Sequence, residues 1–357
     1  MIEDAFIIDA VVHGYNLDPS NFQATAAAKK FAAIAYPQLH KALSPADTRY
    51  VLSEQQFVRT CDPEMLTSCL FDESQTDMGI YHATPLYGFF KDGGSPTSIG
   101  KAVAARAPGR MKFYGAVHPF DTAKAIDDLD RQIEEDGIIG LKFYPNDLWQ
   151  GKLTSFRMDD EKVAFPIFEH ARKRGLHSIA IHKAVVLGPQ PLSDFRLGDI
   201  EGAALAFRNL NFEIVHGGWA FLEDTVMLAQ CFRNIYINLE GGSAFLNIAP
   251  RRFATLIGSL LQAGAEDQIL WATGVMALHP RPLIEKFWQF DMPEDLMEGY
   301  GYPALTKATK RKIFAENFVR LHGLNLPDLA AAIPNDERRR RQQAKLAEPW
   351  SKAEAIA

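Results

Sequence analysis

The sequence predicts a single (β/α)8 barrel, and three observations support this prediction. Short apolar runs rich in β-branched residues alternate with longer helical stretches, which is typical of parallel β/α units. The runs number eight over about 270 residues, the count of this barrel, whereas a doubly wound sheet usually has five or six. No GxGxxG follows the first run. The predicted strands are Phe6–Val12, Met78–Thr84, Lys112–Val117, Ile138–Phe143, His177–Ile181, Phe212–Val215, Ile235–Leu239 and Ile269–Thr273.

Helices are predicted between these strands from capping residues and apolar spacing. Asp121–Asp136 begins with a capping aspartate, and its apolar residues recur at helical spacing. Asp159–Arg174 has one apolar face and ends before Gly175. Pro250–Ala263 begins with a first-turn proline and ends before Gly264.

Two regions depart from the plain barrel, which is expected to span residues 1–330. Residues 15–75 form a long excursion after the first strand, with a helix-like stretch at Ala24–Leu43, and we expect a cap over the mouth because loops at that end build active sites. Residues 331–357 form a charge-rich, helical C-terminal tail with the basic run Arg338–Arg341. A solvated or frayed tail is favoured there over a binding motif.

Composition excludes several classes of protein. The 357 residues include 38 basic and 44 acidic ones, so the net charge of −6 leaves no basic excess for nucleic acid. Three cysteines cannot form a disulfide framework. No apolar run reaches the roughly 18 residues of a membrane span, and the first residues are acidic where a signal peptide is basic. We expect a soluble, cytoplasmic protein with neither a nucleic-acid nor a membrane partner.

Histidines end several of the predicted strands. His13, His182, His216 and His118 lie at a strand end or one residue beyond it, where side chains of a barrel point into the mouth. Three apolar strands that each end in histidine are difficult to explain by packing alone. Imidazoles that converge on one point hold Zn2+ and similar ions, so the pattern favours a metal site or an acid/base pair.

The order of these features resembles the amidohydrolase superfamily. It is closest to the amidohydrolase-related branch, which includes aminocarboxymuconate-semialdehyde decarboxylase, aromatic-acid decarboxylases, lactone hydrolases and hydratases. The resemblance covers about residues 5 to 325. The residues that carry it are Ile8–His13, Gly140–Pro145, His182, Ile214–Gly218, Ile269–Gly274 and the closing helix Lys312–Leu321.

Two positions depart from the ligand pattern that this resemblance implies. Val11 stands where the family has the first histidine of a His-x-His pair, and Gly274 stands where it has a metal-binding or basic aspartate. Glu240, just past the seventh strand, is a candidate to supply the missing carboxylate. One reading is a rearranged set of His13, His182 and Glu240 that holds one divalent Zn or Mn ion. The others are that Glu240 orients a histidine, or that no metal is bound and histidine alone does the chemistry.

Further residues are expected to bind substrate. A strand-four lysine is carboxylated in binuclear members of the superfamily that the sequence resembles, but ligands for a second ion are missing. Lys142 is therefore interpreted as a partner for a substrate carboxylate or as a structural charge at the strand end. Tyr144 and Trp219 place aromatic rings near strand ends, which suits a ring-bearing substrate. Arg252 could clamp a carboxylate. His279, in an unusual His-Pro-Arg-Pro segment, is a secondary candidate.

The predicted function is hydrolysis of an amide, ester or lactone in a small carboxylated cyclic or aromatic-derived compound. A metal ion or a histidine would activate the water, with His216, His182 and Glu240 as catalytic residues. The alternatives are metal-dependent, non-oxidative decarboxylation of an aromatic or unsaturated acid, and a degenerate binding protein. A homodimer or a higher homo-oligomer is expected.

Overall fold

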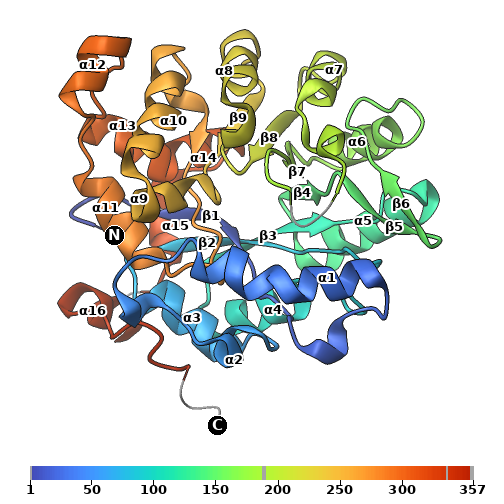
Figure 1. Ribbon diagram of the computed structural model, residues 1–357, viewed down its shortest axis with the longest axis horizontal. Coiled ribbons are helices and arrows are strands. Elements are labelled where there is room, and N and C mark those ends of the chain that lie inside the picture. Colours follow the sequence, from blue (N-terminus) through green and yellow to red (C-terminus); the bar gives the residue numbers. More distant parts are fainter. Residues whose placement is uncertain (1, 187–189, 335–336, 354–357) are drawn as a thin grey trace.

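Eight parallel strands form the predicted barrel (Figure 1). The computed structural model of the chain describes residues 2–186, 190–334 and 337–353. Neighbouring strands pair in the order β1-β2-β3-β4-β7-β8-β9-β10. The strands are β1 Ile8–Val12, β2 Met78–His82, β3 Met111–Ala116, β4 Gly140–Phe143, β7 Ser178–His182, β8 Asn211–Val215, β9 Ile235–Asn238 and β10 Ile269–Leu270.

The barrel closes between β1 and the segment that follows β10. The amide of Ala10 donates to the carbonyl of Trp271 at 2.9 Å, and the amide of His13 donates to the carbonyl of Val275 at 2.6 Å. The buried carboxylate of Asp9 accepts from the amide and the hydroxyl of Thr273. These bonds place the chain after β10 directly beside His13, at the same end of the barrel.

Helices surround the strands (Figure 1). Asp121 caps α5 by accepting from the amide of Lys124, as the sequence predicts, and Gly137 ends this helix in a left-handed conformation. The second predicted helix begins later, at Ala164. The helices are α4 Thr97–Arg106, α5 Thr122–Asp136, α6 Ala164–Lys173, α7 Gly198–Ala206, α8 Leu222–Cys231, α9 Phe245–Ile248, α10 Pro250–Gln262, α11 Pro280–Gln289, α12 Glu294–Tyr300, α13 Lys307–Arg311, α14 Asn317–Leu321 and α15 Leu326–Ala332.

The excursion after β1 contains three α-helices and shares a core with the barrel. The helices are α1 Ala26–Ile34, α2 Glu54–Phe57 and α3 Pro63–Phe71, and a π-helix, Ala35–Lys41, continues α1. Leu17, Leu52 and Phe57 are buried in one apolar cluster with Val12 of β1 and Val275. This cluster joins the excursion, called the cap below, to the barrel.

The C-terminal segment packs against the cap, which differs from the solvated tail expected from its charge. Helix α16, Glu337–Ala344, lies beside α3 (Figure 1). Arg338 forms an ion pair with Asp72, and Gln342 donates to the carbonyls of Ser74 and Thr76. Trp350 is buried in the same cluster as Val12. The charge run hid these contacts, because the tail is anchored by individual polar bonds and one tryptophan.

One further element has no counterpart in the predictions. Strands β5 Asn146–Trp149 and β6 Lys152–Ser155 form an antiparallel hairpin between β4 and α6. No helix in the described ranges is long and apolar enough to cross a membrane.

Candidate active site at the mouth of the barrel

Four histidines lie at the carboxyl ends of four different strands, and three of them, all except His82, line the cavity at the mouth. His13 follows β1, His82 and His182 are the last residues of β2 and β7, and His216 follows β8. All four are buried. His82 was missed by the sequence analysis, which extended its strand to Thr84; the signal was a histidine near the end of an apolar run.

Glu240, His216 and His182 form one chain of hydrogen bonds. The Glu240 carboxylate contacts Nδ1 of His216, and Nε2 of His216 lies 2.7 Å from Nδ1 of His182. Nε2 of His182 lies 2.8 Å from the carbonyl oxygen of Val185. The two imidazoles therefore meet at the mouth, as expected from their strand-end positions, and Glu240 extends the chain to a third strand.

The partners in this chain determine where its protons lie. The Val185 carbonyl only accepts, so Nε2 of His182 carries a hydrogen, and Nδ1 of the neutral ring accepts from His216. Burial, with the charges of His216 and Lys142, lowers the pKa of His182 well below its usual value and keeps this ring neutral. Nδ1 of His216 then shares a proton with Glu240. Burial would raise the pKa of Glu240, but His216, with smaller contributions from His13 and Lys142, outweighs it and lowers that pKa to about 2. The Glu240 carboxylate is therefore charged and accepts from Nδ1 of His216.

Glu240 occupies the space that a side chain at position 274 would need. A Cβ on Gly274 would lie 2.5 Å from Oε1 of Glu240, closer than carbon and oxygen can approach. Gly274 also has a φ of +71°, where a side chain is strained. The carboxylate from β9 and an aspartate after β10 are thus mutually exclusive in this arrangement. Val11, at the other departure from the family pattern, is fully buried in an apolar cluster with Ile80 and Ala272.

Lys142 is a buried ammonium with no hydrogen-bond acceptor in the described ranges. Its side chain on β4 lines the cavity at the mouth, and Nζ lies 5.4 Å from the centre of the Tyr144 ring. Burial lowers the pKa of Lys142 to about 8, although the charges of Glu240 and Glu213 partly oppose this effect. Buried charges are normally paired, so this ammonium favours an anionic ligand.

His13 presents a free ring nitrogen. Its Nδ1 lies 2.9 Å from the carbonyl oxygen of His82 and must donate to it, so Nε2 carries a lone pair. Burial lowers the pKa of His13 to about 4, which keeps the ring neutral. The ring stacks on Tyr15 with centroids 5.0 Å apart.

A cavity of about 990 Å3, including its opening, joins these groups. His13, Lys142, His182, His216 and Glu240 all line it, as do Tyr144 and Trp219 from the predicted substrate-binding set. The hydroxyl of Tyr144 lies 2.8 Å from that of Thr84. Arg252 is exposed and lies over the rings of Trp219 and Phe245, 4.5 and 4.6 Å from their centres. Its guanidinium therefore supports two rings of the cavity wall but is not part of that wall.

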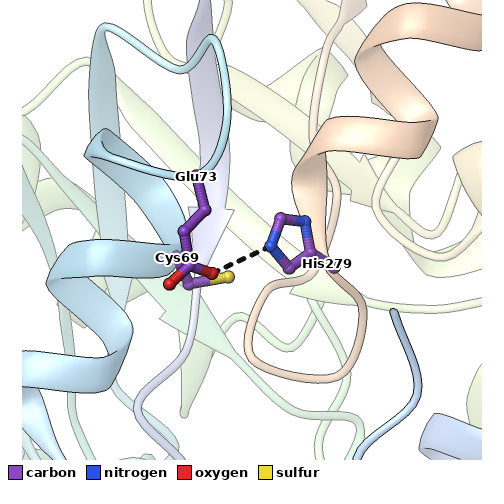
Figure 2. A group of neighbouring side chains, drawn as sticks. All are labelled: Cys69, Glu73 and His279. Atoms are coloured by element: carbon purple, nitrogen blue, oxygen red, sulfur yellow. Dashed lines mark hydrogen bonds and ion pairs between the residues drawn. The ribbon is translucent and has the colours of Figure 1, made fainter. Parts of the chain in front are cut away.

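His279 lies away from this cavity, in a buried group with Cys69 and Glu73 (Figure 2). Its Nε2 lies 3.1 Å from the Glu73 carboxylate, and its Nδ1 accepts from the amide of Arg281 at the start of α11. Glu73 also accepts from the amides of Trp350 and Ser351. The expectation that His279 contacts substrate does not fit this position; its hydrogen bonds instead join the start of α11 to Glu73, which binds the C-terminal segment.

The donors at the mouth do not converge as metal ligands would. Within the described ranges, the only three histidine, cysteine or carboxylate side chains with donor atoms within 4.8 Å of one another are Cys69, Glu73 and His279. Metal-bound ligand atoms lie about 3–4 Å apart, and no three of the mouth groups meet this. Both ring nitrogens of His182 are already hydrogen bonded. The expected set of His13, His182 and Glu240 therefore does not fit one ion in this arrangement. The buried trio could hold an ion, although its Glu73 and His279 atoms already have hydrogen-bond partners.

Comparison with known proteins identifies related folds and a family model. A family model described as Amidohydrolase matches residues 98–324. No curated protein sequence matches the chain. Similar solved structures include an uncharacterized TIM-barrel protein from Bordetella bronchiseptica, which is 17% identical, with a TM-score of 0.61 and coverage of 91% of this chain and 99% of that one.

Two aromatic-acid decarboxylases have similar structures. The 5-carboxyvanillate decarboxylase of Sphingomonas paucimobilis is 14% identical, with a TM-score of 0.58 and coverage of 90% of this chain and 100% of that one. A dihydroxybenzoic acid decarboxylase of Polaromonas sp. JS666, solved with manganese and 2-nitroresorcinol, is 12% identical, with a TM-score of 0.57 and coverage of 91% and 99%. At these identities the similarity establishes the fold alone.

Proposed function

The chain belongs to the amidohydrolase family, and from this premise we propose that it is a carboxy-lyase that removes CO2 from a small aromatic or unsaturated acid. The observation that carries the proposal is a buried proton relay, Glu240–His216–His182, that lines an apolar cavity beside the unpaired ammonium of Lys142. Hydrolysis, the first expectation from the sequence, becomes the second candidate.

The relay can deliver one proton to a carbon atom of the substrate. His182 gives its Nε2 proton, which the carbonyl of Val185 accepts in the free protein, to the carbon that carries the carboxylate, and its Nδ1 takes the Nε2 proton of His216. His216 is left neutral, with its remaining hydrogen toward Glu240. The C–C bond then breaks, its electron pair stays on the ring or double bond, and CO2 leaves. The overall change is R–COO− + H+ → R–H + CO2, and general acid catalysis of this type contributes about 10²–10⁴-fold.

Charge placement supports decarboxylation at this site. Protonation of the carbon requires electron donation from an oxygen substituent on the neighbouring carbon. The ammonium of Lys142 can bind that oxygen and stabilise the negative charge that it carries. The carboxylate loses its charge as CO2 forms, which an apolar cavity favours over water. The decarboxylases that share this fold act on aromatic acids, which supports the same substrate class here.

The test is turnover in D2O with carboxyl-13C-labelled acids. The panel comprises hydroxylated benzoates and alkyl- or aryl-substituted unsaturated acids. The expected result is 13CO2 release with one deuterium at the carbon that held the carboxylate, lost in His182→Gln and retained in the surface control Glu223→Gln. A product that gains 18O from labelled water, with no CO2 release, would refute the proposal.

Ester or lactone hydrolysis remains the second candidate because of one observation. Nε2 of His13 has a lone pair and no partner among the described residues, so it could accept a proton from water. The 18O result above, abolished in His13→Gln, is the outcome that this candidate predicts.

We propose that the reaction at the mouth proceeds without a divalent ion, since no three of its donors meet. The manganese in the Polaromonas enzyme makes this directly testable. Elemental analysis and turnover after exhaustive chelation are expected to show undiminished activity. Loss of activity that stoichiometric manganese or zinc restores would instead support the rearranged site of the sequence analysis.

A further inference from the structure

The cavity has two chemically distinct halves. Its polar side chains come from the strand ends, with Lys142, His182, His216 and Glu240 at the base. The opposite side is the roof, defined here as Leu17, Phe31, Leu39, Leu43, Leu86 and Phe90. The first four come from the cap and the last two from the loop after β2. No roof side chain has a polar atom.

Several roof side chains remain only half-buried. Phe31, Leu39 and Leu43 are neither fully packed nor fully exposed, although the cap around them is well packed. Phe31 contacts the rings of Phe22 and Phe90, with centroids 6.4 and 5.7 Å apart, so the cluster holds its ring in place. The remaining apolar area therefore faces the cavity, where a ligand can cover it.

The roof continues into a second hollow. Phe31, Leu86 and Phe90 line both spaces, and Phe89 and Phe195 extend the second one. The roof and the base line one cavity, so a ligand bound at Lys142 shares that cavity with the roof side chains.

We propose that the roof is a subsite for an extended apolar group, so that the substrate is an amphipathic acid with its polar head at Lys142 and an alkyl or aryl tail under the cap. The head position rests on the proposed function, whereas the tail position rests on the roof alone. A hydroxyl group on the tail would have no partner on the roof, which lowers affinity by roughly ten- to a hundredfold.

The test is calorimetric binding of linear alkanoates from butanoate to decanoate, with alkanols of equal length as neutral probes, to the full chain. Affinity is expected to rise about fourfold per methylene in both series, from the burial of each added group. Leu39→Asp and Leu43→Asn should each reduce this increment, and Leu205→Asp, at an exposed position of α7, should leave it unchanged. Circular dichroism and thermal unfolding identify any variant that is not folded. If one roof variant fails to fold, the other still tests the subsite.

The outcomes separate the subsite from the proposed function. Chain-length dependence in both series without an advantage for the acids would refute the head position at Lys142 and leave the roof subsite supported. Affinity that does not depend on chain length, or an increment that is unchanged in both folded roof variants, would overturn the subsite.

Discussion

Replacement of Glu240 by glutamine removes the carboxylate that accepts from Nδ1 of His216, with little change in side-chain shape. A pKa near 2 in place of 4.5 corresponds to a preference of about 3 kcal/mol for the charged carboxylate. His216 is the largest of the contributions that oppose burial, so the carboxylate and the hydrogen on Nδ1 stabilise each other. In Glu240→Gln only a neutral amide faces Nδ1.

The consequences for rate and stability differ in size. A neutral amide cannot stabilise the hydrogen on Nδ1 by charge while Nε2 of His216 gives its hydrogen to His182, so turnover should fall about 10²-fold or more. The amide can still bond to the imidazole, which limits the loss of unfolding free energy to roughly 1–3 kcal/mol. A large loss of rate with a small loss of stability distinguishes a proton relay from a structural contact.

Nitrogen-15 NMR of the histidine side chains measures this directly and needs no substrate. The native protein should show His216 with a hydrogen on Nδ1, toward Glu240, and Glu240→Gln should shift the signal of this nitrogen. Glu223→Gln, an exposed position on α8, is the matched control. A native protein in which Nδ1 of His216 carries no hydrogen, or a variant in which its signal is unchanged, would refute the reasoning.

Three further predictions follow from particular contacts. Octanoate affinity should fall as pH rises above about 8, by up to tenfold per pH unit, because the anion binds protonated Lys142 and burial lowers that pKa; Lys142→Met should bind octanoate weakly at every pH. Gly274→Asp should destabilise the fold by roughly 1–3 kcal/mol and should not create a metal site, because its Cβ meets Glu240, as urea unfolding and metal titration can measure. Glu73→Gln should cost roughly 2–4 kcal/mol and expose the segment around Trp350 to proteolysis, since a buried carboxylate loses its charge while its donors remain.

Each of these has a contrary outcome and a control. An octanoate affinity that does not change between pH 7 and 10 would contradict binding of the anion by the ammonium of Lys142. A Gly274→Asp variant that is stable and binds manganese or zinc would mean that Glu240 can move aside. For Glu73, the exposed Glu54→Gln on α2 is the control, and equal proteolysis of both variants would show that the tail is not held by Glu73.

Regular patterns made the barrel predictable. Eight β-branched runs separated by amphipathic helices give the strand count and the layer order, because burial of each apolar face depends on local periodicity. The strand-end histidines were equally predictable, because the carboxyl ends of the parallel strands meet at one mouth of the barrel. His13, His182 and His216 were placed there by this reasoning alone.

The positions of single side chains in space could not be predicted in this way. That Glu240 fills the space above Gly274, and bonds to His216, depends on how β9 and the chain after β10 approach each other. His279 was assigned to the substrate because its neighbours in sequence looked unusual, but its partner Glu73 is 206 residues away. Such pairings arise from packing, and no spacing in the sequence encodes them.

The sequence by itself determined the barrel, its mouth and the histidines that end its strands, because these follow from periodicity along one segment at a time. The tertiary structure decided which donors converge, that the C-terminal segment is anchored to α3, and that the cap presents an apolar roof to the cavity. These features depend on segments that are far apart in the chain and become neighbours only when the barrel closes and buries its surfaces together.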